Sequence, residues 1–276
     1  MESWVADIQF ERPGVLRRAL KTCLVDPFAN YAPAGMLKVL LRLARSELAA
    51  ANWADPGGWR SMVITYDGRP RQWADKLLVG AGAMPMALRN RRKLAARLLA
   101  RLIDSVPHDP VQVLCLGAGP GHIIIDALLQ ARCTAHAILV DLNTDAFEYG
   151  RTLAAGCGLS ERVRFVEGDV RDVSGMPDHR VDLVKMLGIC EYLSDGAIVD
   201  IARGVADIMP PGSAVVFNSL SKAHGTDRFF RRVFGLHMIH RSPGELQRLM
   251  ESAGFGGFVS IPEPLGVYHV IAGYRR

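Results

Sequence analysis

Val111-Gln112-Val113-Leu114-Cys115-Leu116-Gly117-Ala118-Gly119-Pro120-Gly121-His122 is the stretch that decides the fold. Its first six residues read as a short apolar strand, and a helical pattern over residues 123–129 follows its three alternating glycines. Glycine tolerates positive φ and lets a backbone approach a ligand closely, because it has no Cβ. A helix that starts at such a turn directs free N–H groups at whatever lies in front of it. The stretch therefore predicts the ligand-binding corner of an open α/β sheet.

The glycine spacing discriminates between nucleotide-binding patterns. A dinucleotide fingerprint, Gly-x-Gly-x-x-Gly/Ala, needs its third small residue at His122, whereas Gly-x-Gly-x-Gly fits Gly117, Gly119 and Gly121. With this spacing after a strand, the sequence resembles the class I S-adenosylmethionine-dependent methyltransferases. That family usually has an acidic residue two places before the first glycine, where this chain has Cys115. Taken alone, the motif also fits a tight turn that binds no ligand.

Acidic residues follow the next two strands of the pattern. Residues 135–140 form an apolar strand that ends at Asp141, about twenty residues after the glycine turn, where a carboxylate can accept hydrogen bonds from ribose hydroxyls. Residues 162–166 form a third strand, followed by Gly168, Asp169 and Val170. In the methyltransferases that the chain resembles, the residue at Asp169 accepts the adenine amino group and the next residue packs on the ring. Either aspartate alone could be a turn residue, but together with the glycine turn they predict one nucleoside site.

The alternation of strands and helices continues to the end of the chain. Further strands are expected at 181–187, 214–218, 258–261 and 268–274, with helices at 197–209 and from a capping box at Ser242 and Glu245 onward. The resemblance implies an α/β fold with a Rossmann-like, seven-stranded, mostly parallel sheet and an antiparallel last strand. For S-adenosylmethionine, the predicted binding residues are Gly117, Ala118, Gly119, Gly121, Asp141, Leu142, Asp169, Val170 and Leu187.

A narrower resemblance covers residues 85–276. It is carried by Arg89-Asn90-Arg91, the glycine turn, residues 188–195, His240-Arg241-Ser242 and Ala253-Gly254-Phe255. These motifs are similar to those of a small group of bacterial proteins regarded as methyltransferases, some of them fused to hydrolase domains. The resemblance implies the class I sheet, and it implies no particular substrate.

Residues 1–105 read as mostly helical and are predicted to form a separate cap, with the methyltransferase domain at 106–276. Met36, Leu40, Leu43 and Leu48 recur at helical spacing, and Trp53, Trp59, Tyr66 and Trp73 stand near two expected turns. The aromatic residues either pack in the core or line an apolar substrate pocket. We expect this helical part to cover the cofactor as a lid, to bind substrate or to mediate a homodimer.

The net charge of +5 is distributed unevenly. Residues 1–110 contain 17 Lys and Arg against 10 Asp and Glu, whereas the remainder contains 16 against 18. Arg89, Lys93, Arg97 and Arg101 step every four residues along one helix face. This stripe is interpreted as a solvated face, because no aromatic residue interleaves it to stack on bases. A tRNA or rRNA methyltransferase that grips phosphates with residues 89–101 is the alternative.

The acceptor is expected to be a small molecule, with nucleic acid disfavoured. The Asp/Asn-Pro-Pro-aromatic motif of amino-directed nucleic-acid enzymes is absent after the fourth strand, where the chain has residues 187–190, and Cys190 is interpreted as a small buried residue. Glu191 and Tyr192 are the candidate catalytic residues, since a weak acceptor needs a base; Glu191 could instead cap the following helix. His224, His237 and His240 are weaker candidates. A metal-free site is expected, because no cluster has metal-ligand spacing.

Composition sets the remaining expectations. The chain has 276 residues, of which 49% are hydrophobic and 22% charged, typical of a globular protein with a substantial core. Its five cysteines show neither a disulfide nor a zinc pattern, which suits the cytoplasm. No signal peptide is recognised at the N-terminus, and no apolar stretch approaches the roughly 20 residues of a membrane span, so no membrane association is expected. A non-catalytic binding module with a methyltransferase fold is the second alternative, supported by Cys115.

Overall fold

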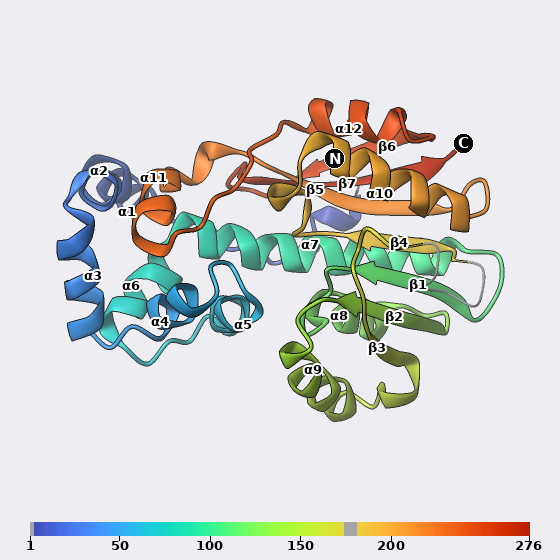
Figure 1. The fold of residues 1–276 in the computed structure, drawn as a ribbon, viewed down its shortest axis with the longest axis horizontal. Helices are drawn as coiled ribbons and strands as arrows, with labels where there is room; N and C mark the ends of the chain where they lie inside the picture. Colours follow the sequence, from blue (N-terminus) through green and yellow to red (C-terminus); the bar gives the residue numbers. More distant parts are fainter. Residues whose placement is uncertain (1–2, 174–180) are drawn as a thin grey trace. The chain divides into compact units, whose positions relative to one another are not determined.

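The computed structural model describes residues 3–173 and 181–276, which fall into two compact units (Figure 1). The first unit comprises Met1–Arg91, Ser221–Met238 and Pro262–Tyr268, and the second comprises Arg92–Leu220, Ile239–Ile261 and His269–Arg276. The expected domain boundary, between residues 105 and 106, follows the end of the helix at Ala83–Ser105. The observed boundary, between Arg91 and Arg92, lies within this helix. The roles assigned to the two parts remain predictions.

The first unit is helical. A 3₁₀ turn at Ser3–Val5 precedes a continuous helical segment made of α1 (Val15–Leu20), a π-helical turn (Lys21–Val25) and α2 (Asp26–Tyr31). The other helices are α3 (Ala34–Leu43), α4 (Glu47–Ala54), α5 (Trp59–Asp67), α6 (Trp73–Ala81), the start of α7 (Ala83–Ser105), η5 (Lys222–His224), α11 (Asp227–Phe229) and a π-helical turn (Phe230–Phe234). The turns expected around residues 55–58 and 67–70 are the connections between α4, α5 and α6.

Buried polar contacts hold this unit together. Arg89 is only 8% exposed, and its guanidinium donates to the Glu11 carboxylate at 2.7 Å and to the carbonyl oxygens of Thr65 and Val79. The interpretation of Arg89 as part of a solvated stripe is therefore wrong, because this position of α7 faces the interior of the unit. Asp75, which is fully buried, accepts a hydrogen bond from the Ser46 hydroxyl at the start of α4.

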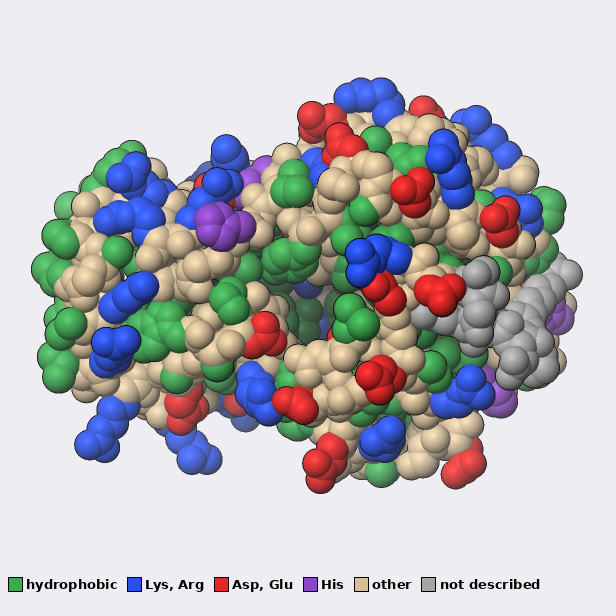
Figure 2. Space-filling model, viewed as in Figure 1, with side chains coloured by type: hydrophobic (Ala, Val, Ile, Leu, Met, Phe, Trp, Pro, Cys, Tyr) green, Lys and Arg blue, Asp and Glu red, His purple; other side chains and the backbone are tan. Residues whose placement is uncertain are grey.

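Apolar side chains also lie on the outside of the first unit. In α3, Met36, Leu40 and Leu43 are exposed, whereas Leu37 is buried. The chain turns at Arg45, whose φ is 50°, before α4 begins, so the expected single helical run is two helices. Figure 2 shows apolar side chains gathered in the region where Figure 1 labels α2 and α3. None of the helices within residues 3–173 and 181–276 is long and apolar enough to span a bilayer.

The second unit is built on a seven-stranded sheet in the order β3-β2-β1-β4-β5-β7-β6. The strands are β1 (Val111–Leu116), β2 (Ala135–Asp141), β3 (Val163–Glu167), β4 (Leu183–Met186), β5 (Ala214–Leu220), β6 (Phe255–Pro262) and β7 (Tyr268–Arg275). The first five pair in parallel. The last two form a hairpin, and β7 lies antiparallel to β5. At the end of β7, the Arg275 carbonyl oxygen accepts a hydrogen bond from the Gly212 N–H, and the Arg275 N–H donates to the Ser213 carbonyl oxygen. The predicted fold class is confirmed.

Helices connect the strands and cover the sheet. They are the remainder of α7, α8 (His122–Gln130), α9 (Asp145–Gly156), η3 (Ser160–Arg162), η4 (Cys190–Tyr192), α10 (Asp195–Ile208) and α12 (Pro243–Glu251). Leu114 and Leu116 of β1 pack in one core with Val184, Met186 and the inner faces of α10 and α12. Val113 and Cys115 point to the opposite face, because side chains alternate along a strand. Because β1, β2 and β3 are parallel, the glycine turn after β1 and the carboxyl ends of β2 and β3 lie at one edge of the sheet.

Candidate functional site

The glycine turn lies between β1 and α8 and has the backbone geometry that glycine permits. Gly117, Gly119 and Gly121 have φ values of 59°, 52° and 82°. A Cβ on Gly117 would stand 2.1 Å from Cγ2 of Ile189, so the loop after β1 and the loop after β4 approach as closely as a bare backbone allows. Gly121 is the N-cap of α8, and no side chain caps this helix. The start of an α-helix carries a partial positive charge, which suits an anionic ligand group.

Asp141, at the end of β2, is bound directly to the glycine turn. Its Oδ2 accepts a hydrogen bond from the Gly119 N–H at 2.8 Å, and its Oδ1 accepts one from the Asn143 N–H at 2.9 Å. The Ala118 N–H also donates to the Val140 carbonyl oxygen at 3.1 Å. The glycine turn and Asp141, two parts of the predicted site, therefore lie side by side. The carboxylate keeps further lone pairs that can accept from hydroxyl groups.

The loop after β3 joins the same place. The Gly168 N–H donates to the Asp141 carbonyl oxygen at 3.2 Å, which brings Asp169 to the end of β2. The Asp169 carboxylate forms an ion pair with the Arg171 guanidinium at 2.5 Å, and these hydrogen bonds lower the pKa of Asp169. Because the pair is exposed, exchanging Arg171 for a ligand group costs little free energy.

The remaining predicted binding residues differ in exposure. Leu142 is 63% exposed directly after Asp141, and Val170 is half-buried after Asp169. Ala118 is half-buried within the glycine turn, whereas Leu187 is only 3% exposed at the end of β4. Leu142 and Val170 therefore offer apolar surface at adjacent strand ends, which suits a flat ring, and the binding role predicted for Leu187 stays a prediction.

The loop after β4 is held by Asn218 of β5. Its Oδ1 accepts a hydrogen bond from the Gly188 N–H at 2.8 Å, and its side-chain amide lies 3.5 Å from Oε2 of Glu191. Glu191 is 5% exposed, and its backbone carbonyl accepts from the Ile239 N–H. Ser194, rather than Glu191, caps α10 by accepting from the Ala197 N–H. The capping role considered for Glu191 is wrong; Tyr192, beside it, is 47% exposed.

Arg241 fixes the other end of that loop. Its guanidinium donates to the carbonyl oxygens of Cys190 and Leu193, each at 2.7 Å, and to the Asp195 carboxylate at 2.8 Å. The sequence around Arg241 and Asn218 indicates no role for either residue. The groups that they hold in the loop after β4 lie 27 to 51 positions away in the chain, so no local sequence pattern predicts these contacts.

The two cysteines near the site are unsuited to nucleophilic chemistry. Burial raises the pKa of the Cys190 thiol to about 12, and burial raises that of Cys115 to about 11 despite the charge of Lys185. Only a thiolate is an effective nucleophile. The interpretation of Cys190 as a small buried residue is confirmed. Cys115 is a neutral thiol at pH 7 and supplies no charge in place of the usual acid.

His122 is the first residue of α8 and lies against the Tyr149 ring, with 5.7 Å between ring centroids. Burial lowers its pKa to about 4, and the positive charge of Arg92 acts in the same direction. Arg92 is itself paired with Asp126 at 2.6 Å. The imidazole next to the glycine turn is therefore neutral at physiological pH.

This shift predicts a pH dependence of stability. Because the unfolded chain binds the proton at about pH 6.5 and the folded chain at about pH 4, the free energy of unfolding should fall by about 3 kcal/mol as the pH drops through that window. Urea unfolding of His122→Gln should show a shallower decline between pH 6.5 and 4 than the wild type. Exposed His136→Gln is the matched control, and parallel curves for wild type and His122→Gln would contradict the shift.

A second prediction concerns Asn218. Asn218→Leu leaves the Gly188 N–H without its acceptor, which should lower the free energy of unfolding by about 1–3 kcal/mol. The neighbouring Ser219→Ala, equally buried on β5, should cost less in the same urea titration. If both substitutions cost the same, Asn218 does not anchor the loop.

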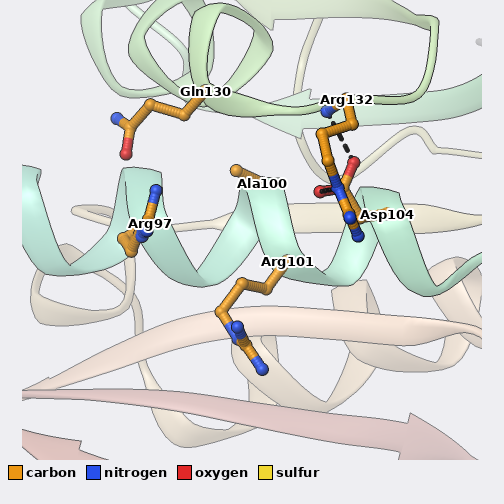
Figure 3. A pocket seen from close by; sticks show the side chains of 6 residues that line it. All are labelled: Arg97, Ala100, Arg101, Asp104, Gln130 and Arg132. Carbon is orange, nitrogen blue, oxygen red and sulfur yellow. Dashed lines mark hydrogen bonds and ion pairs between the residues drawn. The ribbon is translucent and has the colours of Figure 1, made fainter. Parts of the chain in front are cut away.

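A pocket of about 270 Å³ lies at the other end of α8, lined by Arg97, Ala100, Arg101, Asp104, Gln130 and Arg132. Figure 3 shows the side chains of Arg97 and Gln130 pointing toward one another, while Arg132 reaches Asp104. Two residues of the predicted basic stripe, Arg97 and Arg101, thus border a pocket that is separate from the glycine turn. Its charge suits an anion.

The sequence matches the family described as "Putative methyltransferase" over residues 82–275, and the chain belongs to this family. A curated relative, the uncharacterized protein YnbC of Escherichia coli (strain K12), is 26% identical over 177 residues. The match covers 60% of this chain and 30% of YnbC, so the chain spans about a third of that relative's length.

Solved structures share the fold. A Bordetella parapertussis protein described as a possible exported protein superposes with a TM-score of 0.68 at 16% identity, covering 79% of each chain. The N,N-8-amino-8-demethyl-D-riboflavin dimethyltransferase RosA of Streptomyces davawensis gives a TM-score of 0.52 at 19% identity, covering 82% of this chain and 71% of RosA. At these identities the likeness establishes the fold.

Proposed function

We propose that this methyltransferase transfers the methyl group of S-adenosylmethionine to a small-molecule acceptor. The observation that carries the proposal is the direct bonding of three strand ends: the Asp141 side chain to Gly119, and its carbonyl to Gly168 beside Asp169. The fit to the cofactor is supported by the start of α8, where Gly121 is the N-cap and no side chain caps the helix. RosA, with the same fold, is named for a riboflavin derivative.

Each strand end has its own task in this proposal. The positive end of the α8 dipole, beside the glycine turn, holds the amino-acid end of the cofactor, and the Asp141 carboxylate accepts hydrogen bonds from the ribose hydroxyls. Asp169 accepts the adenine amino group, with Leu142 and Val170 against the ring. Ala118 and Leu187 complete the wall.

When bound, S-adenosylmethionine supplies an electrophilic methyl group on a positively charged sulfur. The chain must align the acceptor atom with that methyl and, for a hydroxyl or amine acceptor, remove a proton. Glu191 is assigned as the base and Tyr192 as a positioning residue, since both follow β4 in the same unit. Asn218 orients Glu191 through its amide.

The other unit is assigned to acceptor binding and to pairing of two copies. Its aromatic residues Trp53, Trp59 and Trp73 suit an apolar small molecule. A cytoplasmic location is proposed because all five cysteines are free.

Isothermal titration calorimetry with S-adenosylmethionine and S-adenosylhomocysteine tests the proposal. We expect one site per chain for both compounds and product formation with at least one member of a panel of small phenols, amines and thiols. If neither compound gave a binding heat, the assignment would be overturned. Turnover would dismiss the non-catalytic alternative.

The arginine-lined pocket is the place to test the alternative that the methyl acceptor is RNA. Arg97→Glu with Arg101→Glu should abolish tRNA retention on a gel if these residues grip phosphates. Arg89 is unsuitable for this test, since it is buried in an ion pair. We expect no tRNA methylation by the wild type, and methylation lost in the double variant would favour the RNA alternative.

A further inference from the structure

The helical segment over residues 15–31 contains no buried residue. Leu16, Leu20, Leu24 and Phe28 recur at every fourth position, and between 53% and 84% of each is exposed. Such a row forms a ridge along a helix. Cys23 lies at the middle of the segment and is also exposed.

Helix α3 adds a second exposed row. Met36, Val39, Leu40 and Leu43 are between 41% and 77% exposed, whereas Leu37 of the same helix is buried. The inner side of α3 is thus packed, and its outer side is apolar. We call the two rows and their apolar neighbours the outer face: Val15, Leu16, Leu20, Leu24, Val25, Phe28, Tyr31, Met36, Val39, Leu40 and Leu43.

The outer face is large for a monomer. Each of its eleven side chains exposes on the order of 100 Å², which gives roughly 1,000 Å² in total. The largest apolar patch on a typical monomer is roughly 300–600 Å², and each partner of a standard interface contributes about 800 Å². The area therefore suffices for a stable protein interface.

The segment is held in place within its own unit. The Asn30 side chain donates to the Gly225 carbonyl oxygen at 2.7 Å and accepts from the Phe229 N–H at 3.0 Å. Arg228 and Arg232 both donate to the Asn30 carbonyl oxygen. The outer face is therefore presented by an anchored helix and loses little conformational freedom on binding.

Three basic residues of this region contact groups of the same unit, whereas Arg18 and Arg45 are exposed. Lys21 pairs with Asp26 and donates to the His224 carbonyl oxygen, and Arg17 donates to the Gly80 carbonyl oxygen. The Arg42 guanidinium lies 5.2 Å from the centre of the Trp53 ring. An anionic lipid surface would require basic residues at the rim of the apolar face, so lipid vesicles are one arm of the test below, and the size of the outer face favours a protein partner.

We propose that the outer face binds the outer face of a second copy of this chain, as a two-fold symmetric dimer. The 15–31 segments pack antiparallel, with ridges of residues spaced by four in each other's grooves. Since Cys23 lies at the midpoint, the two Cys23 thiols come close to the two-fold axis. The dimer deepens the pairing proposed above and is independent of cofactor binding.

Sedimentation velocity from 1 to 100 µM tests the dimer with three proteins. The wild type and Leu129→Glu, which alters a 55% exposed leucine of α8, should sediment as dimers. Leu20→Glu, which alters a 53% exposed leucine of the outer face, should sediment as a monomer. Circular dichroism and S-adenosylhomocysteine binding should be unchanged in all three, so a folding failure or a failure of the proposed function is seen separately.

Crosslinking gives the second readout. A short bismaleimide should join wild-type chains into dimers, and Cys23→Ser should remove this product. A wild-type monomer throughout, a Leu20→Glu dimer or crosslinking that survives Cys23→Ser would overturn the proposal. Sedimentation of a monomeric wild type with phosphatidylglycerol vesicles, but not with phosphatidylcholine vesicles, would overturn it in favour of a lipid surface.

Discussion

Asp141→Ala should weaken S-adenosylhomocysteine binding at least about 100-fold. The substitution removes the acceptor of the Gly119 N–H and, in the proposed complex, the acceptor of the ribose hydroxyls. A hydrogen bond to a charged group contributes about 1.5–3 kcal/mol. Losing the two bonds to the ribose hydroxyls therefore raises the Kd by at least about two orders of magnitude.

Calorimetry with matched variants measures this loss. Asp145→Ala, an exposed aspartate four positions further on in α9, should bind as the wild type does. Asp141→Asn should be intermediate, because its amide oxygen still accepts hydrogen bonds without the charge. An Asp141→Ala protein that binds within twofold of the wild type would show that the ribose lies elsewhere.

Gly117→Ala is expected to have the second largest effect. The added Cβ would stand 2.1 Å from Cγ2 of Ile189, at a φ of 59° that alanine adopts only with strain. Strain and overpacking together should lower the free energy of unfolding by about 2–4 kcal/mol and abolish cofactor binding, because the two loops must move apart.

Gly158→Ala separates the two causes. Gly158 has a similar φ of 69°, and no atom lies within 4 Å of its added Cβ. This control should therefore cost only the backbone term, about 1–2 kcal/mol, and should leave binding intact. Equal costs in urea titrations of the two variants would show that the loops after β1 and β4 do not meet closely.

The sheet and the glycine turn could be predicted because their signals are local. Alternating glycines after an apolar strand, and aspartates at the ends of the next two strands, are readable within windows of a few residues. Because parallel strands place their carboxyl ends at one edge, the meeting of Gly119, Asp141 and Gly168 followed from the order of the strands.

The first unit was less predictable. Periodicity identified the helix containing Met36 and Leu40, but it could not tell whether their side faces the core or the surface. Periodicity also could not reveal that residues 221–238, far along the chain, complete this unit through Asn30 and through the Trp53 indole, which donates to the Val233 carbonyl oxygen. Such contacts depend on long-range packing.

The supporting residues of the site were missed for the same reason. Asn218 and Arg241 act on the loop after β4 from distant strands and loops, so their types alone carry no signal. His122 had a weak signal, as a polar residue directly before the apolar run Ile123–Ile125, but its burial and lowered pKa arise from packing.

A crystal structure of the protein with S-adenosylhomocysteine tests the central claim most directly. The account predicts the ribose hydroxyls on the Asp141 carboxylate, the adenine amino group on Asp169 with Arg171 displaced or shared, and the amino-acid end at the glycine turn. Density for the product away from these three strand ends would contradict it.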